Sequence, residues 1–413
     1  MSARWNTLMV LLAATVFSGF ARGDVATDPP ANGKAAGSAA VVDVQDPRAT
    51  VITADSLHTC ALTSSGDAYC WGTGSFGRLG NGSTAEQLTP VAVAGSRKFV
   101  SISAGSSHTC ALTADGKAYC WGNGGNGRLG TGNTNRSLRP RLVVGGHEFS
   151  VLSVGRRYTC GLTNDGTAYC WGVNSNGELG DGTTEDKTEP TAVVGGHKFT
   201  WLSAGAFHSC GVATDGKTYC WGSGTNGKRG DGATTGGSSE PVAVSTDVSF
   251  TSVYAGRQHT CALTAEGEAW CWGANRSRQL GDGTNTAKST PVRVKTDLKF
   301  KSLALGGTHT CGLTASGKVY CWGSNNLGKL GKGDAGGTFA EPQEVALVNN
   351  FVAIEAGYDH TCGKTADGAV YCWGGGEGGR LGHGTLADRS APDRVADFGT
   401  DAPTALLPSR QDR

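Results

Sequence analysis

The chain has 413 residues, and its 66 glycines make up about 16% of it, roughly twice the usual ~7%. These glycines do not recur at every third position, which excludes collagen. Trp, Cys, Leu and Val recur at fixed spacing among them, which argues against disorder. The 36 basic and 35 acidic residues give a net charge of +1. A balance so close to neutral predicts no nucleic-acid partner and no attachment to anionic lipid.

The N-terminus has the pattern of a secretory signal peptide over residues 1–23. Arg4 precedes an apolar run over residues 8–20, and Ala21-Arg22-Gly23 offers small residues for cleavage. The run is too short for a membrane span, and no later segment reaches the ~20 apolar residues that one needs. Residues 24–48 are rich in Ala, Gly, Asp and Pro and read as a flexible spacer. We therefore expect a secreted or periplasmic protein.

All 14 cysteines fall into seven pairs with a spacing of ten positions. An even number, a constant spacing and a signal peptide together indicate an oxidising compartment. Zinc is the competing interpretation, but the closely spaced C-x-x-C pairs typical of zinc sites are absent. No metal site is expected. The pairs are Cys60 with Cys70, Cys110 with Cys120, Cys160 with Cys170, Cys210 with Cys220, Cys261 with Cys271, Cys311 with Cys321 and Cys362 with Cys372.

The pairs mark a repeat of about 50 residues. The first cysteine of each pair recurs after 50, 50, 50, 51, 50 and 51 residues. No segment has sustained helical periodicity, and a period of this length with short strand signals indicates a propeller. The sequence predicts an all-β fold, a seven-bladed β-propeller of four-stranded antiparallel blades over residues 49–398. Residues 399–413 read as a frayed tail.

The register of the central hairpin follows from the spacing. If Cys110 faces Cys120, the strands are joined by the three-residue loop Ala114-Asp115-Gly116. Such a loop favours glycine at its third position, because that residue takes a positive φ. All seven units have glycine there. The cysteines would then occupy a non-hydrogen-bonded site with Cα atoms ~4.5 Å apart, which predicts seven bridges within hairpins.

Tryptophan and histidine also recur in the repeat. A Trp-Gly step follows the second cysteine of each pair. The tryptophan points to the sheet face opposite to that of the cysteine, which predicts packing between blades. Six units have a histidine two residues before the first cysteine, and the third unit has Tyr158. A metal-binding role is disfavoured, because tyrosine is a poor zinc ligand. We therefore expect these rings to form hydrogen bonds with the backbone within each blade. The histidines are His58, His108, His208, His259, His309 and His360.

The unit resembles the regulator of chromosome condensation repeat family. The match is carried by Gly105, His108-Thr109, Ala111-Leu112-Thr113, Asp115-Gly116, Tyr119, Trp121-Gly122, Gly127, Leu129-Gly130 and Gly132. The resemblance covers about residues 49–398 and implies a seven-bladed propeller, here with cysteines adapted to secretion. The nucleotide exchange and chromatin binding for which the family is named are not implied, because a fold does not carry its relatives' function.

Four units contain a G-x-G-x-x-G string, such as the one formed by Gly72, Gly74 and Gly77. A dinucleotide site would require a βαβ unit, which the repeat lacks. Three units have Asn174, Asn275 or Asn325 in place of the middle glycine. Because Gly and Asn both tolerate left-handed backbone, we interpret this position as a structural turn. No catalytic constellation is recognisable, so we expect neither an enzyme nor a cofactor.

Function is expected where the units differ. The hairpin turns are short and uniform, whereas the G-x-x-H loops and the loops after Trp-Gly vary and should share the opposite face. Aromatic and Arg residues are favoured interface anchors, although any one of them can be a solvated loop residue. The candidates are Phe76, Arg156, Arg157, Phe207, Arg257, Arg276, Arg278 and Tyr358.

The leading hypothesis is a monomeric, secreted scaffold that binds another protein through this face. Recognition of envelope polysaccharide is the first alternative, because aromatic residues and shallow loops also suit glycans. A regulator of guanine-nucleotide-exchange type is a weaker alternative.

Overall fold

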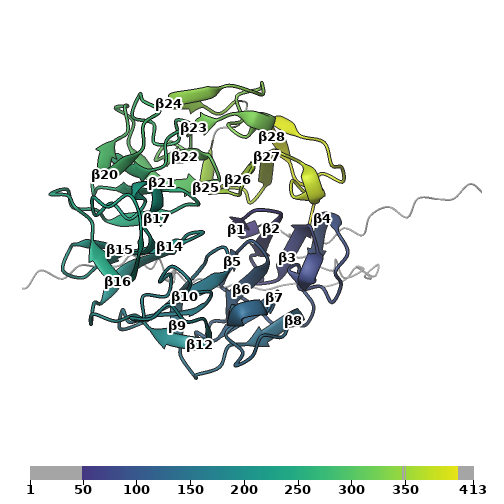
Figure 1. Ribbon diagram of the computed structural model, residues 1–413. Helices are drawn as coiled ribbons and strands as arrows, with labels where there is room; N and C mark the ends of the chain where they lie inside the picture. Colours follow the sequence, from purple (N-terminus) through teal and green to yellow (C-terminus); the bar gives the residue numbers. More distant parts are fainter. Residues whose placement is uncertain (1–48, 347, 349, 399–413) are drawn as a thin grey trace, which may run out of the picture. The chain divides into compact units, whose positions relative to one another are not determined.

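The computed structural model describes residues 49–346, 348 and 350–398, which form seven four-stranded antiparallel sheets arranged around a central axis (Figure 1). The predicted seven-bladed propeller is therefore confirmed. Each blade is built from consecutive strands, in the order first to fourth from the axis outwards. The predicted signal peptide, spacer and tail lie outside the described residues.

Each position in a blade is filled by one strand from every repeat. The first strands, which line the axis, are β1 (Ala49–Ala54), β5 (Ser101–Ala104), β9 (Phe149–Val154), β13 (Phe199–Ala204), β17 (Ser252–Ala255), β21 (Phe300–Leu305) and β25 (Phe351–Ala356). The second strands are β2 (His58–Thr63), β6 (His108–Leu112), β10 (Tyr158–Thr163), β14 (His208–Ala213), β18 (His259–Leu263), β22 (His309–Thr314) and β26 (His360–Thr365).

The outer half of each blade follows the same pattern. The third strands are β3 (Ala68–Gly72), β7 (Ala118–Gly122), β11 (Ala168–Gly172), β15 (Thr218–Ser223), β19 (Ala269–Gly273), β23 (Val319–Ser324) and β27 (Val370–Gly374). The fourth are β4 (Gln87–Ala92), β8 (Ser137–Leu142), β12 (Lys187–Ala192), β16 (Gly237–Ala243), β20 (Lys288–Arg293), β24 (Thr338–Glu344) and β28 (Arg389–Arg394). Five short 3₁₀ turns follow third strands: η1 (Ser75–Gly77), η2 (Gly125–Gly127), η3 (Thr225–Gly227), η4 (Asn326–Gly328) and η5 (Glu377–Gly379).

The central hairpins have the predicted register. Cys110 lies opposite Cys120, and Leu112 lies opposite Ala118, where the strands turn. Gly116 has a φ of 75°, as a three-residue hairpin loop requires. The local constraints of spacing and turn type were therefore sufficient to align the two strands.

All seven predicted disulfides are formed within hairpins. Their Cα atoms lie 4.0–4.1 Å apart, slightly closer than the expected ~4.5 Å. Seven intramolecular bridges suggest an extracellular or otherwise oxidising environment. The bridges join Cys60 to Cys70, Cys110 to Cys120, Cys160 to Cys170, Cys210 to Cys220, Cys261 to Cys271, Cys311 to Cys321 and Cys362 to Cys372.

The blades pack with the disulfide face of one against the tryptophan face of the next. Between the first two blades, Cys60 and Cys70 share a buried cluster with Leu79, Ile102 and Trp121. All seven Trp-Gly tryptophans are fully buried. Burial of a tryptophan in a close-packed interface is among the largest single hydrophobic contributions available. The predicted packing of tryptophan between blades is thus confirmed.

The first and last blades lie side by side and close the ring without exchanging a strand (Figure 1). In the other interfaces a phenylalanine at the start of the first strand, or just before it, packs on the tryptophan, as Phe99 does on Trp121 at 6.0 Å. The first blade has Phe398 in this role, with its ring 6.0 Å from that of Trp71. Phe398, at the C-terminal end of the described chain, therefore takes the place of this phenylalanine, and the bond between His360 and Thr59 joins the same two blades.

Within the part of the chain that the structure describes, no helix is long and apolar enough to span a bilayer.

Candidate functional site: the central channel and the upper face

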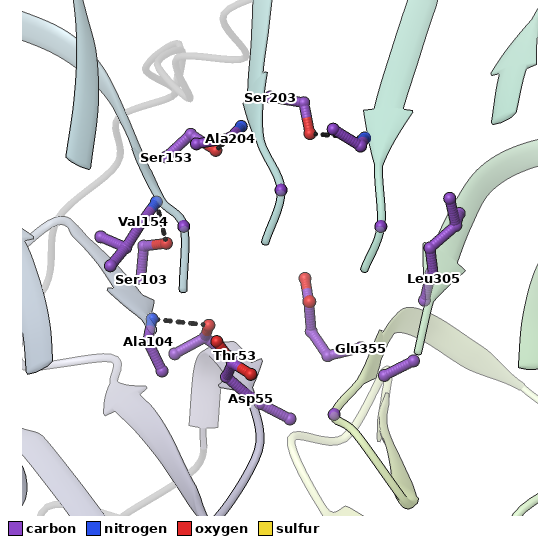
Figure 2. A pocket seen from close by; sticks show the side chains of 18 of the residues that line it. Thr53, Asp55, Ser103, Ala104, Ser153, Val154, Ser203, Ala204, Leu305 and Glu355 are labelled. Atoms are coloured by element: carbon purple, nitrogen blue, oxygen red, sulfur yellow. Dashed lines mark hydrogen bonds between the residues drawn. The ribbon is translucent and has the colours of Figure 1, made fainter. Parts of the chain in front are cut away.

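The seven first strands surround a central channel that contains a cavity of about 390 Å³. In the first four blades the residue facing the first cysteine carries a hydroxyl group: Thr53, Ser103, Ser153 and Ser203. Each hydroxyl accepts a hydrogen bond from a backbone amide of the next blade, for example Ala104 N to Thr53 Oγ1 at 3.1 Å and Ala204 N to Ser153 Oγ at 2.9 Å (Figure 2). This part of the channel wall is a continuous chain of hydrogen bonds between blades.

The last three blades break this chain. The equivalent residues are Tyr254, Ala304 and Glu355, and no described side chain accepts a bond from the amides of Leu305, Ala356 or Ala54. Figure 2 shows the Glu355 side chain reaching from β25 toward the middle of the channel. Among the described residues, the Glu355 carboxyl has no hydrogen-bond or ion-pair partner.

Burial dominates the electrostatics of the channel carboxyls. Glu355 keeps some contact with the channel space but is surrounded by protein, and burial raises its pKa to about 8. Asp55 stands where the other six units have glycine, just beyond the end of β1. Burial raises its pKa to about 6, although hydrogen bonds from Ser56 and the charges of Arg78 and Arg156 act in the opposite direction.

We define the upper face as the loops that join first to second strands and third to fourth strands. The two sets of loops are adjacent, since Thr73 N donates to Leu57 O and Asn123 N donates to Ser107 O. The opposite, lower face carries the hairpin turns and the connections between blades. This arrangement agrees with the expectation that the variable loops share one face.

Four of the eight candidate residues surround the upper mouth of the channel. The Arg156 guanidinium lies over the Phe207 ring at 5.1 Å, and that of Arg257 lies over Tyr358 at 4.3 Å. Arg156 and Arg257 line the cavity, and neither has a carboxylate within ion-pair distance among the described residues. Burial, and then the charges of Arg257 and Arg157, lower the pKa of Arg156. Stacking thus holds two like charges at one entrance.

A ring of buried cations lies beneath the upper face. The residue after each glycine-rich turn is Arg78, Arg128, Lys228, Lys329 or Arg380 in five of the seven blades, and each is almost completely buried. Lys329 pairs with Asp359 at 2.7 Å, whereas Lys228 lies over Phe207 at 5.3 Å. Burial lowers the pKa of Lys228 to about 8. The charge of Lys228 adds to those of the two mouth arginines, whereas Lys329 and Arg380 are paired with Asp359 and Glu377.

The other four candidates lie away from the mouth. Arg157 is exposed and donates to Asn126 Oδ1 at 3.2 Å, while Arg276 is exposed beside the turn of the fifth blade. Phe76 is 46% exposed and has a φ of 64°, a conformation that is a genuine outlier for a bulky residue. Arg278 has the same φ at a position where the other six units have glycine. The described contacts do not join Phe76, Arg276 or Arg278 to the mouth.

The repeated histidines bond between blades, so the expectation of backbone bonds within each blade is wrong. His58 Nε2 lies 2.8 Å from Thr109 Oγ1, and the same pair recurs at the other five histidines. Thr109 donates its one hydroxyl proton to Arg78 O, so the histidine must be the donor. Burial lowers the pKa of all six well below the ordinary value, or to about 3 at His259.

Tyr158 replaces the histidine of the third blade and still reaches across the interface. Its hydroxyl donates to His208 O at 2.7 Å and lies 2.9 Å from Ser209 Oγ. The prediction that this position is structural therefore agrees with the contacts. In the part of the chain that the structure describes, no group of three His, Cys, Asp or Glu side chains is arranged to hold a metal ion.

The glycine-rich string after Trp-Gly is a structural turn, but not for the expected reason. Its middle glycine has ordinary negative φ values, such as −86° at Gly74. Glycine is needed because the loop closes on itself: a Cβ on Gly124 would lie 1.8 Å from Asn135 O. Asn174 instead uses its side chain to close the loop, accepting from Leu179 N at 2.9 Å and donating to Asp181 at 3.0 Å.

Sequence reasoning did not single out the channel residues Asp55, Trp201, Tyr254 and Glu355. The sequence does distinguish these residues, because in an alignment of the seven units each of them is larger than the residues at the equivalent positions of most other units. What was missing was the knowledge that these positions face the channel. Trp201 is 36% exposed there and contacts Tyr254, with ring centroids 5.4 Å apart.

The sequence matches the profile of the regulator of chromosome condensation (RCC1) repeat. Seven consecutive copies match residues 65–112, 115–162, 165–212, 215–263, 266–313, 316–363 and 367–404. A second profile of the same repeat matches five segments between residues 99 and 380. Each of the first six copies begins in the hairpin of one blade and ends in the second strand of the next.

Solved structures with this fold resemble the chain at low sequence identity. Prp20p from Saccharomyces cerevisiae superposes with a TM-score of 0.72 at 23% identity, covering 82% of this chain and 88% of its own. Human WBSCR16 gives 0.69 at 24% identity, covering 75% and 84%. The ectodomain of the Physcomitrella patens receptor kinase CR4 gives 0.53 at 20%, covering 79% and 74%. These likenesses concern the fold alone.

One curated relative is the human E3 ubiquitin-protein ligase HERC2, 52% identical over 42 residues. The matched segment is 10% of this chain and spans about 1% of the length of HERC2.

Proposed function

The chain belongs to the regulator of chromosome condensation (RCC1) repeat family, and from this premise we propose that it is an exported, non-catalytic scaffold that binds another protein through its upper face. Residues 1–23 would act as a signal peptide and residues 24–48 as a spacer. The seven disulfides are consistent with this destination, since such bridges persist in oxidising compartments. Among the structures with this fold, Prp20p is described by its binding to Gsp1p and histones and in complex with Kap60.

The observation that carries the proposal is the arrangement of Arg156, Phe207, Arg257 and Tyr358. Each arginine is stacked on a ring, so little side-chain entropy remains to be lost when a partner binds. Neither forms an ion pair with a described carboxylate. Arg and aromatic residues dominate binding energy at protein interfaces. We infer that the partner presents a carboxylate to the two guanidinium groups, with Arg157, Phe76, Arg276 and Arg278 as outer contacts.

The proposal is tested by capture of envelope and culture proteins on the immobilised mature protein. We expect a partner whose retention falls at least tenfold with the triple variant Arg156→Ala, Arg157→Ala, Phe207→Ala. The control is Lys198→Ala on the lower face, where Lys198 pairs with Asp165. Retention that is unchanged in the triple variant would reject the upper face as the site.

Envelope polysaccharide is a second candidate, favoured by the aromatic rings of Phe207 and Tyr358 at the mouth. A glycan array that gives no signal removes this candidate. A nucleotide-release assay with candidate GTPases tests the weaker exchange activity in the same way.

A further inference from the structure

The channel wall departs from its repeat at three side chains that face one space. Trp201 in β13 and Tyr254 in β17 form an edge-to-face aromatic pair, with ring centroids 5.4 Å apart and planes inclined by 64°. Trp201 is held in place by a bond from Nε1 to Val253 O at 2.6 Å. Glu355 in β25 points into the same cavity, and its charge acts on the Tyr254 hydroxyl. The equivalent residues of the first three blades are smaller and uncharged.

From this arrangement we propose that the central channel binds an organic ammonium cation, with Glu355 as the counter-ion and Trp201 and Tyr254 as the aromatic wall. A carboxylate beside aromatic faces is the arrangement that recognises ammonium groups, since the ring faces are electron-rich. The cavity of about 390 Å³ lies in the range of small-molecule sites. This site is separate from the protein-binding function proposed for the upper face.

Structural roles do not explain Glu355. In the first four blades the equivalent hydroxyl accepts an amide bond from the next blade, such as Ala255 N to Ser203 Oγ at 2.9 Å. Glu355 makes no such bond to Ala54 N, and burial of its unpartnered carboxyl is unfavourable. A serine would continue the hydrogen-bond chain at this position. Keeping glutamate therefore costs stability, which a ligand that pairs with the carboxylate would offset.

The other charged groups that line the cavity are compatible with a cation beside Glu355. Arg156 and Arg257 lie in loops, two residues beyond the ends of β9 and β17, and are stacked on Phe207 and Tyr358. Glu355 lies within β25, deeper in the channel. Asp55 lines the cavity between these levels and adds a second carboxyl. The channel thus changes from positive at the mouth to acidic inside.

The test uses isothermal titration of the full mature protein with n-butylammonium, and with n-butanol as the neutral analogue of the same shape. We expect saturable binding of one n-butylammonium and no binding of n-butanol. Because burial raises the pKa of Glu355 to about 8, pairing with a cation at pH 7 should release about one proton. The proton release is measured as a dependence of the binding heat on the ionisation heat of the buffer.

Two variants and a control decide the role of Glu355. Glu355→Gln should weaken n-butylammonium binding at least tenfold and abolish the proton release. Glu355→Ser should do the same while raising the melting temperature, which excludes misfolding as the cause. Glu185→Gln, an exposed loop carboxylate, should bind like the unchanged protein. The proposal is overturned if n-butylammonium fails to bind, or if Glu355→Gln binds it equally well.

Two sources of the same cation are distinguished by a second ligand, Nα-acetyl-lysine N-methylamide. If it binds about as tightly as n-butylammonium, a lysine side chain of a polypeptide can enter the channel. If only n-butylammonium binds, the ligand is a small free amine. Capture of a protein partner by the upper face should survive Glu355→Gln, so this proposal and the preceding one can fail separately.

Discussion

The blade interfaces and the channel wall are built from the same seven repeats, yet they differ in how uniform they are. At the interfaces, a buried tryptophan and a histidine–hydroxyl pair recur almost without change, and Tyr158 replaces its histidine by an equivalent contact. Along the channel, the equivalent positions change from Thr53 to Tyr254 to Glu355. Uniform positions serve the scaffold, which every blade needs, whereas positions that vary are free to serve recognition.

The largest effect expected is the loss of stability in acid, which should arise at the interfaces between blades. Six interface histidines stay neutral because burial lowers their pKa, while in the unfolded chain they titrate near 6.5. Below pH 6.5 the unfolded state binds more protons, so stability is lost as the pH falls. Each histidine adds up to about 1.4 kcal/mol per pH unit to this slope. Denaturant titrations between pH 7 and pH 5 measure this slope, and His259→Gln should reduce it by up to about 1.4 kcal/mol per pH unit.

Loss of one interface tryptophan should follow in size. Trp121→Ala removes a fully buried side chain and its bond from Nε1 to Arg78 O at 2.9 Å. We expect a loss of about 3–5 kcal/mol in the free energy of unfolding, measured by chemical denaturation. Trp201→Ala in the channel is the matched control and should cost less than half as much, since Trp201 is partly exposed. Equal losses would contradict the distinction between interface and channel.

Removal of one disulfide should have a smaller effect. Replacing Cys110 and Cys120 together by serine opens a loop with a sequence separation of ten residues. The chain-entropy estimate for such a loop is about 2.5–3 kcal/mol. Differential scanning calorimetry should show a lower melting temperature with the fold retained, because the other six hairpins keep their bridges. A variant that fails to fold would show that the bridges act together.

The smallest effect is expected at a varying loop position. Arg278→Gly restores the residue of the other six units at a φ of 64°. Relief of the left-handed strain should raise stability by about 0.5–1 kcal/mol, measured by thermal unfolding. If Arg278 contacts the partner, capture should weaken in the same variant. A loss of stability would show that the Arg278 side chain supports the loop.

Prediction from the sequence was correct for contacts within a hairpin and failed for some contacts with other parts of the fold. The cysteine spacing and the loop glycines predicted the register of every hairpin, because these constraints act between residues that are close in the sequence. The histidines were expected to bond within their own blade, but the Thr109 hydroxyl that His58 contacts lies 51 positions away. Gly74 was expected to be left-handed, but it is required by the close approach of Ala85 O. Both outcomes depend on neighbours that spacing does not identify.

The sequence alone therefore determined the blade number, the strand order, the disulfide pairing and the variable loops, because a covalent hairpin repeated seven times leaves few other arrangements. Only the tertiary structure decided which of the variable residues meet. Arg156, Phe207, Arg257 and Tyr358 come from the third, fourth, fifth and seventh blades, and closure of the ring brings them to one mouth. The same closure places Glu355, Tyr254 and Trp201 around one cavity, because the first strand of every blade faces a common axis.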